Sequence, residues 1–225
     1  MIKGLIFDFN GVIVDDYPIQ KEAWNYISQV IRKKSVTDLE MINVIRGVPA
    51  KDTVSWMSNN SLSPERLNKI VEEKATMVKK LFAQSSLFCL NKGLAEFLDE
   101  LKFKNIPRTI ATSSSLEDMQ FSFSRLGLNK WFDINLVIYN DGSYKGKPAP
   151  DPYLKAAAKL NLSPSECAVF EDAVSGIKSA HAAGSDTIVA VGSDERLKKL
   201  NQLMGVKICI HNFTEINLDN LLNVE

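Results

Sequence analysis

The chain has 225 residues, of which 45% are hydrophobic and 24% are charged, which suffices for one sizeable core and a smaller satellite domain. Its 27 basic and 27 acidic residues cancel, so no overall charge favours nucleic acid or an anionic membrane as a partner. No apolar run approaches the roughly 20 residues of a membrane helix, and a strand-like run follows Met1-Ile2-Lys3 too soon for a signal peptide. We therefore expect a cytoplasmic monomer whose three cysteines are free thiols.

Strand-like runs alternate with helical patterns over most of the chain, which predicts an α/β fold with a Rossmann-like, doubly wound parallel sheet. The predicted strands lie near 5–9, 109–112, 136–139, 168–170, 187–191 and 207–210. The alternation is interrupted by helical patterns around 19–31, 38–45, 52–58 and 64–82, with no convincing strand between them. We therefore predict an α/β core formed by residues 1–14 and 87–225 and a small inserted α-helical cap domain formed by residues 15–86.

The first strand leads into Asp8, and an aspartate at a strand end can act as a phosphate-accepting nucleophile. On its own, Asp8 is equally consistent with a turn residue. Asn10 follows two residues later, where a carboxylate could protonate a leaving group and then activate water. A carboxamide has no proton-transfer pKa near neutrality, so Asn10 does neither well.

Three later segments place further polar groups where strands end or loops turn. A run of hydroxyls around Ser113 follows the second strand, Lys147 lies in a proline-rich turn, and Glu171 with Asp172 ends a buried strand. Ligands of open parallel sheets bind outside the carboxyl ends of the strands, so we expect these groups to gather around Asp8. A nucleophile, donors for phosphoryl oxygens and acids for a metal are what phosphoryl transfer requires.

With these segments the chain resembles the haloacid dehalogenase superfamily, and within it the group of β-phosphoglucomutase and small sugar-phosphate phosphatases. The resemblance implies that Asp8 is the nucleophile, Ser113 the phosphate-binding hydroxyl and Lys147 the phosphate-binding lysine. It also implies a Mg²⁺ ion held by Asp8, by the acid pair Glu171 and Asp172, and by the backbone carbonyl of Asn10. The chain departs from the family at Asn10, where phosphotransferases carry an aspartate as general acid and base.

Several assignments have neighbours that compete for the same role. Thr112 competes with Ser113, Lys145 competes with Lys147, and Ser114 lies in a stretch that also fits a helix-capping box. The free N–H groups of a helix start suit a phosphate, so we expect Ser114 to contact the substrate. In the cap, Arg46 and Lys51 lie in a loop that faces the catalytic residues in relatives, where they could bind the non-reacting part of a substrate or remain solvated.

We therefore predict a Mg²⁺-dependent phosphatase of a small phosphorylated metabolite, such as a sugar phosphate, that forms a phosphoaspartate at Asp8 and is impaired by Asn10. The alternative is a low-turnover protein that binds phosphorylated metabolites. A phosphomutase is disfavoured, because the histidine and the arginine that take part in β-phosphoglucomutase correspond here to Gln20 and Ala50.

Overall fold

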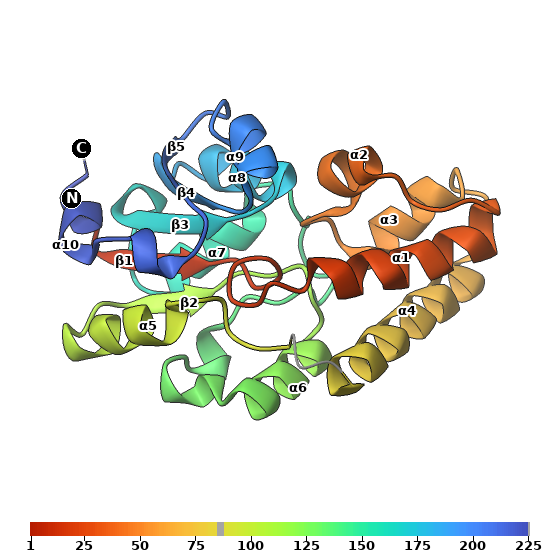
Figure 1. Ribbon diagram of the computed structural model, residues 1–225, viewed down its shortest axis with the longest axis horizontal. Coiled ribbons are helices and arrows are strands. Elements are labelled where there is room, and N and C mark those ends of the chain that lie inside the picture. Colours follow the sequence, from red (N-terminus) through yellow and green to blue (C-terminus); the bar gives the residue numbers. More distant parts are fainter. Residues whose placement is uncertain (85–87, 225) are drawn as a thin grey trace.

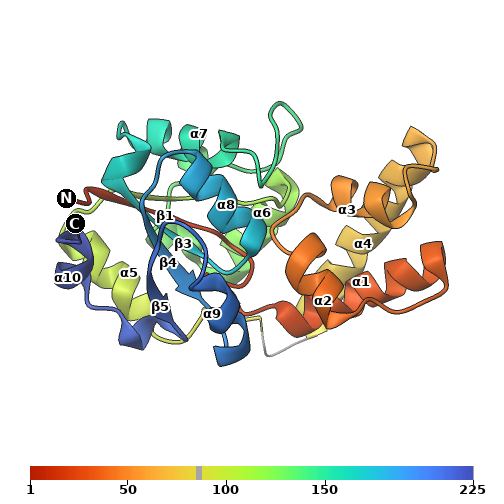
Figure 2. The same ribbon diagram turned by 90° about the horizontal axis from the view of Figure 1, so that it is seen from above.

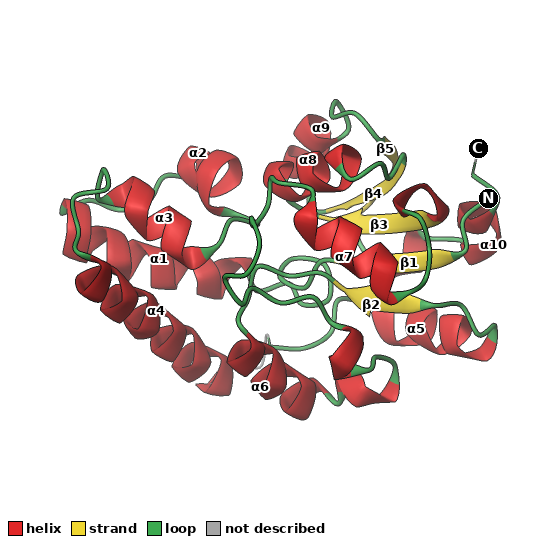
Figure 3. Ribbon diagram, turned by 180° about the vertical axis from the view of Figure 1, so that it is seen from behind, coloured by secondary structure: helices red, strands yellow, loops and turns green. Residues whose placement is uncertain are grey.

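The computed structural model describes residues 1–84 and 88–224. Five parallel strands form one sheet in the order β2-β1-β3-β4-β5, with helices on both faces (Figure 1, Figure 3). The strands are β1 (Gly4–Phe7), β2 (Arg108–Ile110), β3 (Cys167–Glu171), β4 (Thr187–Val191) and β5 (Val206–Ile210). The predicted doubly wound α/β fold is therefore confirmed.

Successive residues of β1 point to opposite faces of the sheet, as the pleat requires. Leu5 and Phe7 belong to one buried cluster and Ile6 to another. The first cluster includes residues of α5 (Leu94–Phe103), α6 (Leu116–Leu126) and α10 (Leu218–Leu222). The second includes residues of α7 (Asp151–Lys159), α8 (Val174–Ala182) and α9 (Asp194–Leu200). β1 is thus buried on both faces, which fixes the position of the residue that follows it.

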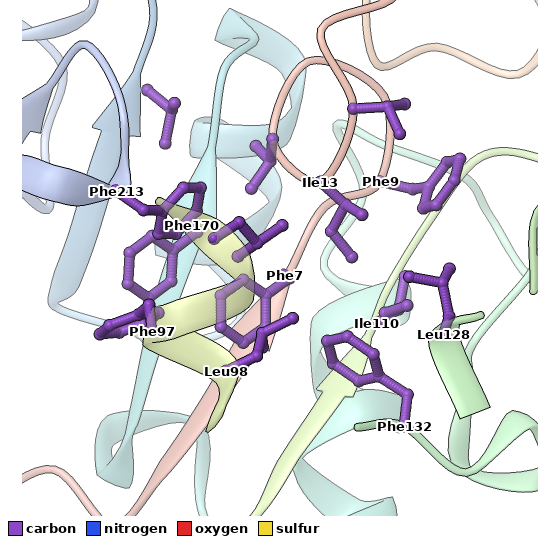
Figure 4. Close-up of a cluster of buried hydrophobic side chains, with 14 of the residues drawn as sticks. Phe7, Phe9, Ile13, Phe97, Leu98, Ile110, Leu128, Phe132, Phe170 and Phe213 are labelled. Carbon is purple, nitrogen blue, oxygen red and sulfur yellow. The ribbon is translucent and has the colours of Figure 1, made fainter. Parts of the chain in front are cut away.

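Aromatic rings fasten β1 to β3 at the centre of the sheet (Figure 4). The rings of Phe7 and Phe170 stack with their centroids 4.8 Å apart, and Phe97 and Phe213 pack against both of them. Aromatic pairs of this kind add about 0.5–1.5 kcal/mol beyond the burial of their surface. The two strands whose carboxyl ends carry the predicted nucleophile and acid pair are therefore held in register by packing below the site.

Four helices lie beside the sheet rather than on its faces (Figure 1, Figure 2). They are α1 (Tyr17–Arg32), α2 (Asp38–Glu40), which continues as the π-helical turn η1 (Met41–Ile45), α3 (Ala50–Met57) and α4 (Pro64–Gln84). This helical insertion has its own buried cluster, which includes Trp24, Ile27, Val54 and Ile70. No strand occurs among the described residues from 15 to 84, as predicted, whereas the predicted boundary between 86 and 87 lies outside the described residues.

The predicted strand at 136–139 is wrong. Residues Ile134–Leu136 form a 3₁₀ turn (η3), which the Asp133 carboxylate caps by accepting a hydrogen bond of 2.9 Å from the backbone N–H of Asn135. Only an isolated bridge joins Ile138 to Ala111 beyond the end of β2. Val137 and Ile138 are buried as strand residues would be, but the capped turn leaves too few extended residues for a ladder.

The remaining short turns are the 3₁₀ elements η2 (Leu128–Lys130), η4 (Pro164–Glu166) and η5 (Phe213–Glu215). In the part of the chain that the structure describes, none of the helices is both long and apolar enough to cross a membrane.

Candidate active site

The predicted site residues converge beside the carboxyl end of β1. The chain passes from β1 to β2 on one side of it and later to β3 on the other, so the strand order reverses there, which is where ligands bind in open α/β sheets. Asp8 follows β1, Ser113 follows β2, and Asp172 follows β3. All three line a cavity of about 370 Å³ that also takes in residues of the helical insertion.

Lys147 lies at the centre of a buried ion network. Its Nζ donates to Asp8 Oδ1 at 2.7 Å, to Glu171 Oε1 at 2.6 Å and to the backbone carbonyl of Ala111 at 3.0 Å. The Tyr153 hydroxyl donates to the same Glu171 oxygen at 2.6 Å. Sequence reasoning missed Tyr153, although its place at the start of the helix after the lysine turn is a usable signal.

The burial of this network changes the proton affinities of its members. Burial raises the pKa of the Asp8 carboxyl to about 7, against the opposing attraction of Lys147. Burial alone would lower the pKa of Lys147, but the charges of Asp8 and Glu171 outweigh it, and the pKa is raised. The ammonium group therefore stays charged, and it offers positive charge next to the atom that would attack phosphorus.

Three buried carboxylates are grouped so that they could hold a metal ion. One oxygen each of Asp8, Glu171 and Asp172 lies within 4.8 Å of the others. Adjacent carboxylates repel one another unless a cation offsets their charge, and oxygen ligands of this kind suit Mg²⁺. The donor set thus fits the implied ion, while the carbonyl of Asn10 as a further ligand stays a prediction.

Two glycines allow the acids to pack so closely. Gly11 has a φ of +88°, and a Cβ there would collide with the Asp172 carboxylate. A Cβ on Gly176 would collide with Glu171. Both Glu171 oxygens have protein partners, because Oε2 accepts hydrogen bonds from the backbone N–H groups of Asp172 and Ala173 at 2.9 and 3.1 Å.

The neighbouring hydroxyl residues 112–115 make different contacts. Ser113 lines the cavity, and its Oγ donates to the backbone carbonyl of Gly47 in the helical insertion at 2.8 Å. Ser114 donates to Asn10 Oδ1 at 3.0 Å, while the buried Thr112 accepts from the Ser114 N–H at 3.1 Å. Ser115 caps α6. Ser113 and Ser114 are thus at the cavity, whereas Thr112 supports the turn behind it.

The two predicted contacts from the helical insertion differ in their burial. The Arg46 side chain is only 9% exposed and forms an ion pair with Asp172, which also accepts from Arg196 at 3.2 Å. Burial lowers the pKa of Arg46 to about 10, with the like charge of Arg196 acting in the same direction. Arg46 Nη1 is buried and has no hydrogen-bond partner among the described residues. Lys51 is exposed at the cavity wall, and it lies in the first turn of α3 rather than in a loop as predicted, because the helix begins directly after Pro49.

A polar cluster lies on the other side of Asn10, and sequence reasoning missed two of its members, Asp16 and Lys74. Asn10 Nδ2 donates to Asp16 Oδ2 at 2.5 Å, and Gln20 Nε2 donates to the same oxygen at 2.7 Å. Lys74 of α4 donates to Gln20 Oε1 at 2.6 Å. All four residues line the cavity. Burial raises the pKa of Asp16, against the hydrogen bond from Gln20.

Comparison with known proteins gives consistent findings. Residues 2–184 match the model of a hydrolase family described as haloacid dehalogenase-like hydrolase. A phosphorylated carbohydrates phosphatase of Thermotoga maritima is 30% identical over 190 residues, which cover 84% of this chain and 85% of that protein. β-Phosphoglucomutase of Bacillus subtilis is 28% identical over 233 residues, covering 98% and 94%. A crystal structure of a HAD hydrolase, family IA, variant 3, from Entamoeba histolytica superposes with a TM-score of 0.87 at 35% identity, covering 99% and 98%.

Proposed function

Because the chain belongs to the haloacid dehalogenase-like hydrolase family, we propose that it hydrolyses the phosphate ester of a small phosphorylated carbohydrate. The observation that carries this proposal is the buried contact of 2.7 Å between Asp8 and Lys147, inside the carboxylate cluster and beside the cavity. It supports the proposal because the carboxylate that would act as nucleophile, a cation and acids that could bind a metal lie together. Dependence on Mg²⁺, a cytoplasmic location and a monomeric state are part of the proposal.

The residues of the site divide the chemistry among them. Asp8 attacks phosphorus and forms a phosphoaspartate, while Lys147 and Ser113 bind the phosphoryl oxygens. Asp8, Glu171 and Asp172 would hold Mg²⁺, which when bound supplies positive charge against that of the phosphoryl group. Water then hydrolyses the phosphoaspartate and regenerates Asp8.

The cavity supports a substrate of sugar-phosphate size. Its volume of about 370 Å³ lies in the lower part of the range of small-molecule sites. Its wall on the helical insertion combines apolar side chains such as Trp24 and Val48 with the cations of Arg46, Lys51 and Lys74. The unpaired Nη1 of Arg46 is a donor for a substrate oxygen. In this proposal the helical insertion is the cap that covers the substrate and excludes water.

Asn10 is the observation that favours a second candidate, a protein that binds phosphorylated metabolites with little turnover. A carboxamide has no proton to transfer near neutral pH, and this one is held in place as a donor to Asp16 and an acceptor from Ser114. Against this candidate, Asp8, Lys147 and the acid pair are all present and in contact. A mutase is the weakest candidate, because Gln20 and Ala50 stand at the two positions that set β-phosphoglucomutase apart.

A screen of small phosphate esters with and without Mg²⁺ tests the proposal, with the Asp8→Asn variant as a control for contaminating phosphatases. We expect Mg²⁺-dependent release of phosphate from one or more sugar phosphates by the wild-type protein alone. Calorimetry with the same esters measures binding and so tests the second candidate. Binding in the presence of Mg²⁺ without turnover would favour the binding protein, and neither binding nor turnover would contradict both candidates.

A further inference from the structure

Asp16 occupies a position in which an aspartate usually has a structural task. It is the N-cap residue of α1, where a side-chain oxygen normally accepts a backbone N–H of the first helical turn. The Asp16 side chain accepts no such bond. It is 3% exposed and lies in the wall of the cavity that contains Asp8. Burying a carboxyl group is costly, and capping of the helix does not offset that cost here.

The hydrogen bonds of Asp16 leave one oxygen for a ligand. Asn10 and Gln20 both donate to Oδ2, and no described residue donates to Oδ1. A proton on this carboxyl group therefore belongs on Oδ1, because Oδ2 already faces two N–H groups. The oxygen that is available to a substrate is thus also the oxygen on which a proton would lie.

The orientation of each amide is fixed by a further contact. Ser114 donates to Asn10 Oδ1 at 3.0 Å, and Lys74 donates to Gln20 Oε1 at 2.6 Å, so in both amides the NH₂ group is turned towards Asp16. An aspartate at position 10 could not donate to Asp16 when ionised. The carboxamide at position 10 and the carboxyl group at position 16 therefore form a matched pair.

We infer that Asp16 is the proton donor and acceptor of the reaction, in place of a carboxyl group at position 10. This inference rests on the proposed phosphatase function. Asn10 then holds the acid in place instead of acting as one.

The two steps balance with Asp16 in this role. As Asp8 bonds to phosphorus, the bond from phosphorus to the ester oxygen breaks, and the proton on Asp16 Oδ1 moves to that oxygen. The alcohol leaves neutral, and Asp16 becomes a carboxylate. A water oxygen then bonds to phosphorus, the bond to Asp8 breaks, and Asp16 takes the proton that the water loses. Inorganic phosphate leaves, and both carboxyl groups return to their starting states.

The test compares Asp16→Asn with Asp15→Asn, which removes the same group at the adjacent, exposed position. The substrates are the sugar phosphate that the wild-type protein hydrolyses fastest and 4-nitrophenyl phosphate, whose leaving group needs no proton. In Asp16→Asn, kcat/KM for the sugar phosphate should fall by about 10²- to 10⁴-fold, the usual worth of a positioned acid or base. For 4-nitrophenyl phosphate it should fall by less than about tenfold. Asp15→Asn should match the wild type with both esters.

The second step gives a separate signature. Without a base to activate water, the Asp16→Asn phosphoenzyme should accumulate, so that 4-nitrophenol appears in a burst followed by slow turnover. Mg²⁺ affinity by calorimetry should stay at the wild-type value. Equal losses of kcat/KM with both esters, no burst, or a parallel loss of Mg²⁺ affinity would overturn the inference.

Exchanging the two side chains keeps their hydrogen bond while moving the acid. The double variant Asn10→Asp/Asp16→Asn should regain at least tenfold in kcat/KM for the sugar phosphate relative to Asp16→Asn, and no recovery would overturn the inference. Intact-mass analysis must accompany each assay, because Gly11 makes Asn10 prone to deamidation. A wild-type protein inactive on every ester would refute the proposed phosphatase, whereas an active one unaffected by Asp16→Asn would refute only the role of Asp16.

Discussion

The cavity has two polar sides that are built differently. On the core side, formed by Asp8, Lys147, Glu171 and Asp172, opposite charges are buried in contact with one another. On the insertion side, formed by Asn10, Asp16, Gln20 and Lys74, two amides separate the one carboxyl group from the one ammonium group. The core side therefore brings opposite charges together, whereas the insertion side keeps them apart with the neutral amides of Asn10 and Gln20.

In the proposed reaction, the phosphoryl group binds on the core side and the proton is transferred on the insertion side. The core side concentrates charge where the phosphoryl group would bind. Interactions between charges are stronger there than in water, because the buried surroundings have a low dielectric constant. The insertion side offers the cavity one oxygen of Asp16 that accepts no hydrogen bond from a described residue, and the charges of Arg46 and Lys74 act on this carboxyl group. Substitutions on the core side should therefore abolish turnover or destabilise the protein. Substitutions on the insertion side should instead change how strongly the rate depends on the leaving group of the ester.

The largest effect is expected for Asp8→Asn, which keeps the shape of the side chain but removes the nucleophile. Turnover should fall by at least about 10⁴-fold, as measured by phosphate release. Ser113→Ala is the control, because it removes one phosphate donor and should cost only about 10²-fold. Substantial activity in Asp8→Asn would contradict a phosphoaspartate at this residue.

The second largest effect is expected for a substitution that removes a carboxylate from the metal site. Asp172→Ala should weaken Mg²⁺ binding by on the order of 10²-fold or more, because outer-shell changes alone cost about 10- to 100-fold. Titration calorimetry measures this directly, and Asp186→Ala, at an exposed carboxylate, should bind Mg²⁺ like the wild type. Unchanged affinity in Asp172→Ala would remove this residue from the metal site.

Lys147→Met should destabilise the metal-free protein by about 3–5 kcal/mol near pH 8, because it leaves Asp8 and Glu171 buried without their cation. The folded pKa of Asp8 is raised from 3.8 to about 7, so its ionisation costs stability as the pH rises through that interval. Loss of Lys147 increases this cost, and the difference from the wild type should shrink as the pH falls towards 4.

Urea unfolding in EDTA at several pH values measures that difference. Lys145→Met is the matched control, since Lys145 is exposed two residues away and should change stability little. A difference that stays constant with pH would show that lost packing, not unpaired carboxylates, destabilises the variant.

The smallest effect is expected on the insertion side. Lys74→Met removes the donor that orients Gln20. Because Lys74 is two hydrogen bonds away from Asp16, the change should lower kcat/KM for a sugar phosphate by about tenfold or less. Lys80→Met, an exposed lysine of the same helix, should have no effect. A loss for Lys74→Met as large as that for Asp8→Asn would mean that Lys74 contacts the reacting groups itself.

Much of the core side could be predicted from the sequence, because it depends on where strands end. The run at 187–191 is observed as β4 over the same residues, and Asp8, Ser113 and Asp172 follow strands that were recognised as apolar runs. Once these strands pair in parallel, their ends must meet at one edge. The role of Tyr153 in the site was not predicted, because an aromatic residue in an amphipathic helix usually indicates core packing.

The insertion side could not be predicted in the same way. Asp16 follows Asp15 at a helix start, a pattern that indicates an N-cap. Its contact with Asn10 depends on a tight turn, in which the Gly11 N–H donates to the Val14 carbonyl at 2.6 Å and folds the chain back. Its contact with Gln20 depends on which of several carboxylate orientations the buried surroundings select. No local propensity distinguishes that orientation from capping.

The loop between η1 and α3 is fastened to the core through its main chain. Ser113 and Ser175 donate to the backbone carbonyls of Gly47 and Arg46 at 2.8 and 2.7 Å. Because a carbonyl oxygen is the same in every amino acid, these two bonds do not depend on which side chains the loop carries, apart from the glycine whose φ is +71°. The side chains beside these bonds, Arg46 in the loop and Lys51 in the first turn of α3, line the cavity and can therefore change in evolution without undoing the docking of the loop.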